Sequence, residues 1–384
     1  MNTNNDQLTW AEVDLRAVKH NLREIKRLTK CHSLVLPTRP KITAQAKVLA
    51  VVKADAYGHG MVAVAQAIEK DIYYFGVSNS AEAITLRKAG IKKPILLFES
   101  TFANLADDIV KYDLTATVCT HQLAAAINKH AKRAKKIAPV HLKIDTGMSR
   151  LGVSFEEAMD FIREVASLKN IYVEGIYTHF PSADTNKALT EKQLKLLHQF
   201  VQRLDVLAFR VPLVHAANSM GLAGYKTKMV NLVRPGLMIY GLLPSAGIQK
   251  LNLKPALQIK SKVIFLKTLE KGTGVSYGHR FVAKHRMQIA IIPIGYNDGY
   301  FRSLSNKASV LIAGRRCPIL GNVTMDQIIV DVSRVKNVKL GSRVTILGKD
   351  QKKTITADEL AKHAKTINYE IVCSLGNRIT RSFS

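Results

Sequence analysis

Short apolar runs and longer amphipathic segments alternate between residues 47 and 241 of this 384-residue chain. The runs that predict strands are Val48–Val52, Tyr74–Val77, Pro94–Phe98, Ala116–Val118, Val140–Ile144, Val173–Thr178, Leu213–Ala216 and Val230–Val233. The segments that predict helices are Met61–Glu69, Ala81–Ala89, Gln122–Ala134, Phe155–Leu168 and Glu191–Leu204. This alternation is typical of βαβ units around a parallel sheet. About eight repeats favour an α/β fold with a closed (β/α)8 TIM-type barrel, and an open doubly wound sheet is the alternative.

After Gly241 the pattern changes to strand-like runs separated by glycine and proline. The predicted strands of this region are Ile259–Leu266, Gln288–Ile294, Ser309–Ile312, Ile328–Val332 and Arg343–Ile346. We therefore expect a barrel over residues 15–242 and a second, smaller C-terminal β-rich domain over residues 243–384, joined by an amino-terminal strand at 8–14. A helix at Leu15–Leu28 and an irregular stretch at 31–44 should lead into the barrel.

Lysine and arginine outnumber aspartate and glutamate by 57 to 29, which gives a formal net charge of +28. Such a charge favours anionic ligands and non-specific contact with nucleic acid. The basic residues are spread over several predicted helices, as at 16–30 and 129–136, without interleaved aromatics or a recognition motif. We therefore expect no specific nucleic-acid partner, although a basic nucleic-acid-binding protein remains an alternative.

The first residues lack the basic and apolar regions of a secretory signal, and no apolar run approaches the roughly 20 residues that span a bilayer. Cys31, Cys119, Cys317 and Cys373 lie far apart, which favours reduced thiols over a disulfide framework. We expect a cytoplasmic protein without membrane contact.

Polar residues follow several of the predicted barrel strands. They are Lys53, Lys143, Asp145, Arg150, His179, Asn218, Ser219 and Arg234. In a closed barrel the carboxyl ends of the strands form one rim, where active sites lie. Any one of these residues could be a helix cap or a satisfied core group, but together they predict a site. A lysine held there in low dielectric is a usable nucleophile, whereas a solvated strand end is the alternative for Lys53.

The loops after the last two barrel strands are where such barrels often bind phosphate. Ser219 and Gly236 lie in these loops, and Tyr57 follows Lys53 by four residues. A lysine that can form an imine, a phosphate site on the same rim and a nearby phenol together indicate pyridoxal 5'-phosphate as cofactor.

Six motifs resemble those of the barrel-type alanine racemases, and the resemblance covers nearly the whole chain. The motifs are Val-Val-Lys-Ala-Asp-Ala-Tyr-Gly-His-Gly at 51–60, Lys-Ile-Asp-Thr-Gly-Met-Ser-Arg-Leu-Gly at 143–152, His-Ala-Ala-Asn-Ser at 215–219, Arg-Pro-Gly at 234–236, Val-Ser-Tyr-Gly at 275–278 and Ile-Gly-Tyr-Asn-Asp-Gly at 294–299. The resemblance implies interconversion of L- and D-alanine, which supplies D-alanine for peptidoglycan.

The resemblance also implies that two residues are catalytic. Lys53 would bind pyridoxal phosphate covalently and then act as one of two acid/base groups, with Tyr277 as the other. In this family the two domains face each other across a head-to-tail homodimer with shared active sites, so Tyr277 would come from the partner subunit. Two bases suit racemisation, because a proton leaves one face of the α-carbon and returns to the other.

The remaining roles follow from the same resemblance. Arg234 would meet the pyridine nitrogen and, with His179, form a hydrogen-bonded relay behind the tyrosine. Arg150 would lie near the cofactor phenolate oxygen and the substrate, oriented by Lys143, which is commonly carbamylated in this family or else forms a simple salt bridge. The expected phosphate-binding residues are Tyr57, Ser219, Gly236 and Leu237, and Asn218 is a further expected cofactor-binding residue. The expected substrate residues are Met325, Asp326 and Tyr296, and Tyr296 could equally be an ordinary packed tyrosine.

Asn377 departs from the family pattern, because a tyrosine usually stands at this position. A smaller residue should loosen the space around the substrate side chain, so a racemase that also accepts serine or larger amino acids is an alternative. A barrel-type pyridoxal-phosphate decarboxylase is another alternative, but such an enzyme would need a carboxylate at the position of Arg234. A non-catalytic cofactor-binding barrel normally lacks the whole β-rich domain.

Overall fold

The computed structural model describes residues 7–30, 45–99, 102–225, 229–243 and 251–384. The predicted irregular stretch at 31–44 lies outside the described residues. The chain divides into two compact units. We call Met1–Arg16, Tyr57–Gly60 and Pro255–Ser384 the β unit, and Ala17–Ala56 and Met61–Lys254 the barrel unit.

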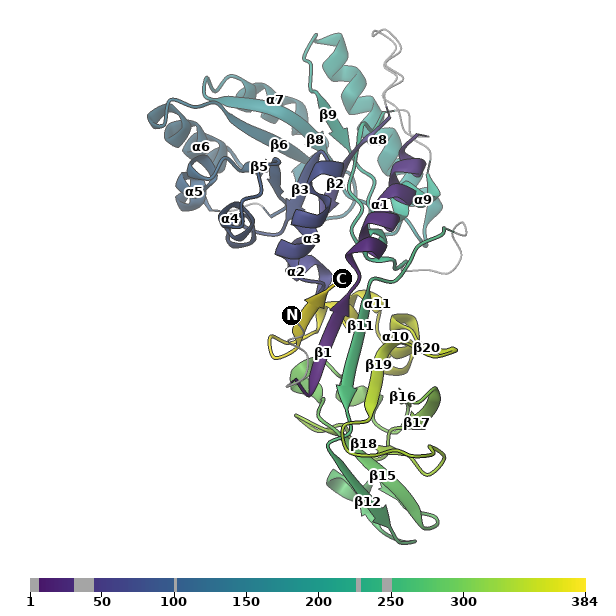
Figure 1. Ribbon diagram of the computed structural model, residues 1–384. Coiled ribbons are helices and arrows are strands. Elements are labelled where there is room, and N and C mark those ends of the chain that lie inside the picture. The colour runs from purple at the N-terminus through teal and green to yellow at the C-terminus, as the bar shows by residue number, and fades with distance from the viewer. Residues whose placement is uncertain (1–6, 31–44, 100–101, 226–228, 244–250) are drawn as a thin grey trace. The chain divides into compact units, whose positions relative to one another are not determined.

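The barrel unit contains eight parallel strands in the order β10-β2-β3-β4-β5-β6-β8-β9. Figure 1 labels β2, β3, β5, β6, β8 and β9 among them. Their bounds are β2 Lys47–Val51, β3 Tyr74–Val77, β4 Ile95–Leu97, β5 Thr115–Val118, β6 Ala138–Asp145, β8 Ile171–Tyr177, β9 Leu213–His215 and β10 Leu232–Val233. Backbone bonds from Asn231 N to Val214 O (3.0 Å) and from Arg234 N to Ala217 O (2.8 Å) join the two ends of this order. The prediction of a TIM-type barrel with a separate β-rich domain is therefore confirmed.

Helices connect the barrel strands, as the amphipathic pattern predicts. They are α1 Leu15–Thr29, α3 Met61–Ile68, α4 Ser80–Lys88, α5 Ala106–Lys111, α6 His121–Arg133, α7 Ala158–Ala166, α8 Lys187–Val206 and α9 Ser219–Gly224. Strands β3 and β5 are buried at every residue, as expected for strands covered by helices on one side and by the barrel interior on the other. The sequence pattern missed α5 and α9, which are only 6 residues long. No helix among the described residues is long and apolar enough to cross a bilayer.

The β unit is built on a seven-stranded sheet with the order β17-β16-β19-β11-β1-β21, in which β20 also pairs with β19. The bounds are β1 Thr9–Val13, β11 Leu257–Lys262, β16 Ser309–Ile312, β17 Arg315–Pro318, β19 Arg343–Asp350, β20 Lys353–Ile355 and β21 Thr380–Phe383. Strand β1 runs antiparallel to β11 and parallel to β21. Segments from near both ends of the described chain thus lie side by side in one sheet.

A three-stranded sheet, β12-β15-β18, and a hairpin of β13 and β14 complete the strands of the β unit. Their bounds are β12 Phe265–Leu269, β13 Gly274–Val275, β14 Phe281–Val282, β15 Met287–Ile292 and β18 Ile328–Asp331. The predicted strand at 259–266 is therefore two strands in different sheets, β11 and β12. Two helices that the pattern did not predict, α10 Ala357–Ala364 and α11 Asn368–Cys373, follow β20.

A left-handed turn follows the first barrel strand. Helix α2, Lys53–Tyr57, has φ values of 53°, 52°, 55° and 54° at its last four residues, none of which is glycine. For L-residues this conformation costs about 1–2 kcal/mol each. Side-chain oxygens hold it in place, because Glu82 Oε1 accepts from Ala54 N (2.7 Å) and Asp55 Oδ1 accepts from Met61 N (2.8 Å). The backbone beside Lys53 is thus fixed by its surroundings rather than by its own preference.

This turn generates a stability prediction. Ala54 is exposed, so replacing it with glycine relieves backbone strain without removing a packed methyl group. We expect Ala54→Gly to raise the free energy of unfolding by about 0.5–1 kcal/mol. The matched control is Ala125→Gly, at an exposed position inside α6, which should lower it by about 1 kcal/mol. Calorimetric unfolding of both variants measures the difference, and the same sign of change in both would contradict the interpretation.

Candidate functional site

The predicted rim residues of the barrel unit lie within electrostatic range of one another. Burial lowers the pKa of His179 well below its ordinary value, and the positive charges of Arg234, Lys143, Arg150 and Lys53 lower it further. These residues follow or belong to four different segments of the chain, so the fold brings them together. Cationic side chains around one neutral imidazole would favour an anionic ligand at this rim.

The guanidinium of Arg234 is the most heavily hydrogen-bonded group of the rim, and the residue is 3% exposed. Its Nη1 donates to His215 Nδ1 (2.9 Å), and its Nη2 lies 3.1 Å from His179 Nδ1. Nη2 also donates to the carbonyl oxygens of Thr178 (2.9 Å) and Ala216 (3.0 Å). Burial lowers the pKa of Arg234 to about 10. Within the described residues, Nε–H of this side chain has no protein acceptor, so it can donate to a bound molecule.

Lys143 is also buried, at 3% exposure, and lies on β6. Burial, and after it the charge of Arg150, lower its pKa to about 8. Its Nζ lies 5.7 Å from the ring centroid of Tyr177. A substantial fraction of neutral amine therefore exists near neutral pH, and the neutral amine is the form that reacts with carbon dioxide.

The loops after β9 and β10 meet at Ser219, which is buried at the start of α9. Its Oγ accepts from the backbone N–H groups of Gly236 (3.0 Å) and Met238 (3.4 Å). Leu237 lies between these two residues at the start of the 3-10 helix η3, Leu237–Tyr240. These two bonds leave the Ser219 hydroxyl hydrogen and the N–H of Leu237 as nearby donors of the kind that suits phosphate. The side chain of Asn218 caps α9, because its Oδ1 accepts from Gly221 N (2.8 Å).

Tyr57 and Lys53 are the two ends of α2. Lys53 is half-buried. Burial raises the pKa of Tyr57, and its ring centroid lies 6.1 Å from that of Tyr369 within the β unit. Tyr57 is therefore a phenol that stays protonated and can donate a hydrogen bond.

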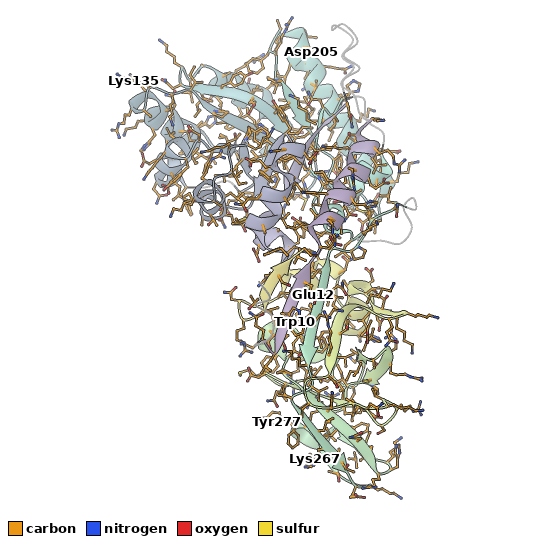
Figure 2. The ribbon with its side chains drawn as sticks, in the orientation of Figure 1. Trp10, Glu12, Lys135, Asp205, Lys267 and Tyr277 are labelled. Carbon is orange, nitrogen blue, oxygen red and sulfur yellow. The ribbon has the colours of Figure 1, made fainter. Side chains whose placement is uncertain are left out.

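Tyr277 projects from the surface of the β unit and is 75% exposed (Figure 2). It begins the short 3-10 helix η4, Tyr277–His279, and its carbonyl oxygen accepts from Asn322 Nδ2 (2.7 Å). Tyr296 and Met325 are exposed as well, at 42% and 52%. Their loops are joined by the bond from Tyr296 N to Thr324 O (3.0 Å). Large apolar side chains with this exposure suit contact with another molecule.

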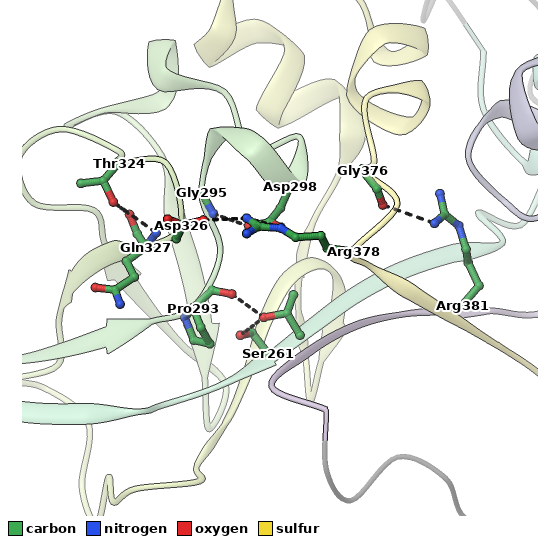
Figure 3. A network of polar contacts seen from close by, with 11 residues as sticks. Ser261, Pro293, Gly295, Asp298, Thr324, Asp326, Gln327, Gly376, Arg378 and Arg381 are labelled. Carbon is green, nitrogen blue, oxygen red and sulfur yellow. Dashed lines mark hydrogen bonds and ion pairs between the residues drawn. The ribbon is translucent and has the colours of Figure 1, made fainter.

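Arg378, which the sequence pattern did not single out, connects three segments of the β unit (Figure 3). It forms ion pairs with Asp326 (2.8 Å) and Asp298 (3.0 Å). Asp298 in turn accepts from Gly295 N (2.9 Å). The loop of Tyr296, the loop of Asp326 and the turn that contains Asn377 are thereby held against one another.

A second set that sequence reasoning missed lies behind Arg234, inside the barrel. His215 Nε2 lies 2.8 Å from His141 Nδ1, and His141 Nε2 lies 3.5 Å from Glu174 Oε2. Tyr74 Oη donates to the same carboxylate oxygen (2.6 Å). In the sequence, the spacing of His141 was the one indication of this set. His141 precedes Lys143 by two residues, so the two side chains lie on the same face of the strand.

Comparisons with known proteins agree over the full length. The profile of the alanine racemase N-terminal domain matches residues 13–244, and that of the alanine racemase C-terminal domain matches residues 256–383. An alanine racemase of Halothermothrix orenii is 38% identical over 386 residues, which covers 100% of this chain and 98% of that protein. One from Methanococcus maripaludis is 40% identical, covering 97% and 98%. The solved alanine racemase of Clostridium difficile 630 has a TM-score of 0.91 at 36% identity, covering 99% and 97%.

Proposed function

This chain belongs to the alanine racemase family, a family of pyridoxal-phosphate-dependent isomerases, and we propose that it interconverts L- and D-alanine by moving the α-proton between two bases. The observation that carries the proposal is the buried, cation-lined rim around Arg234. We place the reaction in the cytoplasm, as a supply of D-alanine for peptidoglycan.

The rim residues fit pyridoxal phosphate. The Ser219 hydroxyl and the loop at Gly236 and Leu237, through the Leu237 N–H, would hold the phosphate, with Tyr57 as a further donor. Arg234 Nε–H would donate to the ring nitrogen, and Arg150 would meet the phenolate oxygen. Asn218 supports this arrangement by capping α9 and so placing Ser219.

When bound, the cofactor withdraws electron density from the α-carbon and makes its proton acidic. An arginine does not readily give up its proton, so Arg234 would leave the ring nitrogen of the bound cofactor unprotonated. This favours a racemase over the decarboxylase alternative, which would want a carboxylate there. Lys53 is the base proposed for one face of the α-carbon.

The base for the other face would be Tyr277 of the partner subunit. Its exposure supports this, because a side chain that is 75% exposed in one protomer can be covered by a second. His179 accepts from Arg234 at Nδ1, so its Nε2–H is the group that can donate to the phenol oxygen. We propose a homodimer in which each barrel rim is completed by the β unit of the partner, including its Met325, Asp326 and Tyr296 near the substrate.

The two-base proposal predicts a difference between the enantiomers. L- and D-alanine would be incubated in deuterated water with wild type, Tyr277→Phe, and Lys53→Ala supplied with methylamine. We expect the rate of α-proton exchange in each variant to fall by at least about a hundredfold for one enantiomer and by less for the other. The enantiomer that is more affected should differ between the two variants, because each base serves one face of the α-carbon. The measurement is deuterium incorporation by NMR.

Tyr172→Phe is the matched control, because Tyr172 is an exposed tyrosine of β8 at 47% exposure. It should exchange like wild type. Equal loss for both enantiomers in both variants would contradict the assignment of one base to each face.

We also propose that Lys143 is carbamylated and orients Arg150. In 13C-enriched bicarbonate we expect a carbamate signal that grows as the pH rises through about 8, where the buried amine of Lys143 loses its proton. The signal should be absent from Lys143→Gln. Lys260→Gln, at another buried lysine whose pKa burial lowers, should keep it. A signal that persists in Lys143→Gln would contradict the proposal.

A broader substrate range is the second candidate, and the position of Asn377 favours it. Asn377 is exposed in the turn before Arg378, the residue that ion-pairs with Asp326. We expect Asn377→Tyr to lower kcat/KM for serine relative to alanine by about tenfold, because a larger ring narrows the space for the side chain. Turnover of alanine, serine and lysine by both proteins measures this, and identical ratios would refute it.

A further inference from the structure

A line of buried polar groups crosses the barrel interior from Arg234 to Glu174. His215 and His141 are both 0% exposed, and the Glu174 side chain is 19% exposed. The successive contacts are Arg234 to His215 (2.9 Å), His215 to His141 (2.8 Å) and His141 to Glu174 (3.5 Å). Buried polar groups are costly unless each is satisfied, so a chain of four suggests a purpose beyond packing.

The direction of every bond in this chain follows from its first member. A guanidinium can only donate, so His215 Nδ1 is an acceptor and the proton of that ring lies on Nε2. His215 Nε2–H then donates to His141 Nδ1, which leaves the proton of His141 on Nε2, facing the carboxylate. Burial lowers the pKa of both histidines, so both rings are neutral. The chain therefore links one cation to one anion through two neutral imidazoles.

In the part of the chain that the structure describes, no carboxylate is among the groups that act directly on Arg234. The titratable groups around it are Lys143, Tyr177, His179 and His215, and within the described residues only Tyr177 favours its charged form directly. At the far end, although burial opposes it, the hydrogen bond from Tyr74 and the nearby Nε2–H of His141 hold the pKa of Glu174 below its ordinary value. His141 Nε2 makes no hydrogen bond within the described residues, so its 3.5 Å approach to Glu174 is an electrostatic contact. Glu174 is thus the ionised carboxylate toward which the two imidazoles lead from the guanidinium.

We propose that Glu174 and His141 are positioning residues for Arg234. Through His215 they orient the guanidinium so that Nε–H faces the ring nitrogen of the cofactor, and they keep its charge compensated inside the barrel. This rests on the proposed function, because it assumes that pyridoxal phosphate is the molecule on the rim. As positioning residues, both would act through Arg234 rather than by contact with the substrate or the cofactor.

The test compares binding of two ligands to the cofactor-free protein. One is pyridoxal phosphate, and the other is its analogue with carbon in place of the ring nitrogen, which cannot accept a hydrogen bond from Arg234. The variants are Glu174→Gln, which keeps an acceptor oxygen but removes the charge, and Glu174→Asp, which keeps the charge. Glu156→Gln is the matched control, because Glu156 is an exposed carboxylate of the same unit. Absorbance titrations give the two dissociation constants for each protein.

We expect wild type, Glu174→Asp and Glu156→Gln to bind pyridoxal phosphate more tightly than the analogue. In Glu174→Gln the ratio of the two dissociation constants should fall by about tenfold. His141→Phe keeps a ring but breaks the chain, so it should lose the preference as Glu174→Gln does.

Equal weakening of both ligands in Glu174→Gln, or an unchanged preference, would overturn the proposal. A second readout needs no variant and no cofactor: 15N NMR of labelled histidines should show His141 and His215 neutral with the proton on Nε2, and the opposite tautomer at either would also overturn it. If wild type bound neither ligand, the proposed function itself would fail, which is a distinct result.

Discussion

The buried guanidinium of Arg234 is the group on which the chemistry of the barrel interior depends. It cannot accept a hydrogen bond, so it determines which nitrogen of His215 and of His179 carries a proton. Its charge helps to keep His179 neutral. A residue that is 3% exposed therefore sets the protonation pattern on both sides of it, toward the rim and toward the far end of the barrel.

Much of this arrangement could be predicted from the sequence, because barrel strands carry their signal locally. A continuous apolar run such as residues 48–52 predicts a buried strand, and a lysine directly after the run predicts a side chain at the rim of the barrel. Glu174 and His141 were missed because a single polar residue in an apolar strand looks like an ordinary core residue until its partner, far away in sequence, is known. The left-handed turn at 54–57 was missed for another reason, because none of its residues is the glycine that normally marks such a conformation.

The β unit shows the limit of motif reasoning more clearly. The segments at 294–299 and 325–326 and the departure at Asn377 stand apart in the sequence, with nothing in their spacing to join them. Arg378 connects them through two carboxylates, and this depends on tertiary structure alone. The substitution at Asn377 therefore lies beside an ion-pair network rather than in an isolated loop, so a change in this turn is felt by the loops of Tyr296 and Asp326.

The pairing of β1 with β11 and β21 also bears on how the protein is made. Residues 9–13 leave the ribosome long before their partner strands, which begin at residues 257 and 380. The segments that form the barrel unit lie in the sequence between β1 and its two partner strands. The barrel segments therefore emerge while β1 is still an unpaired strand. An unpaired strand edge can pair with other chains. The time between synthesis of β1 and synthesis of β11 and β21 is therefore a period in which this protein is exposed to misassembly.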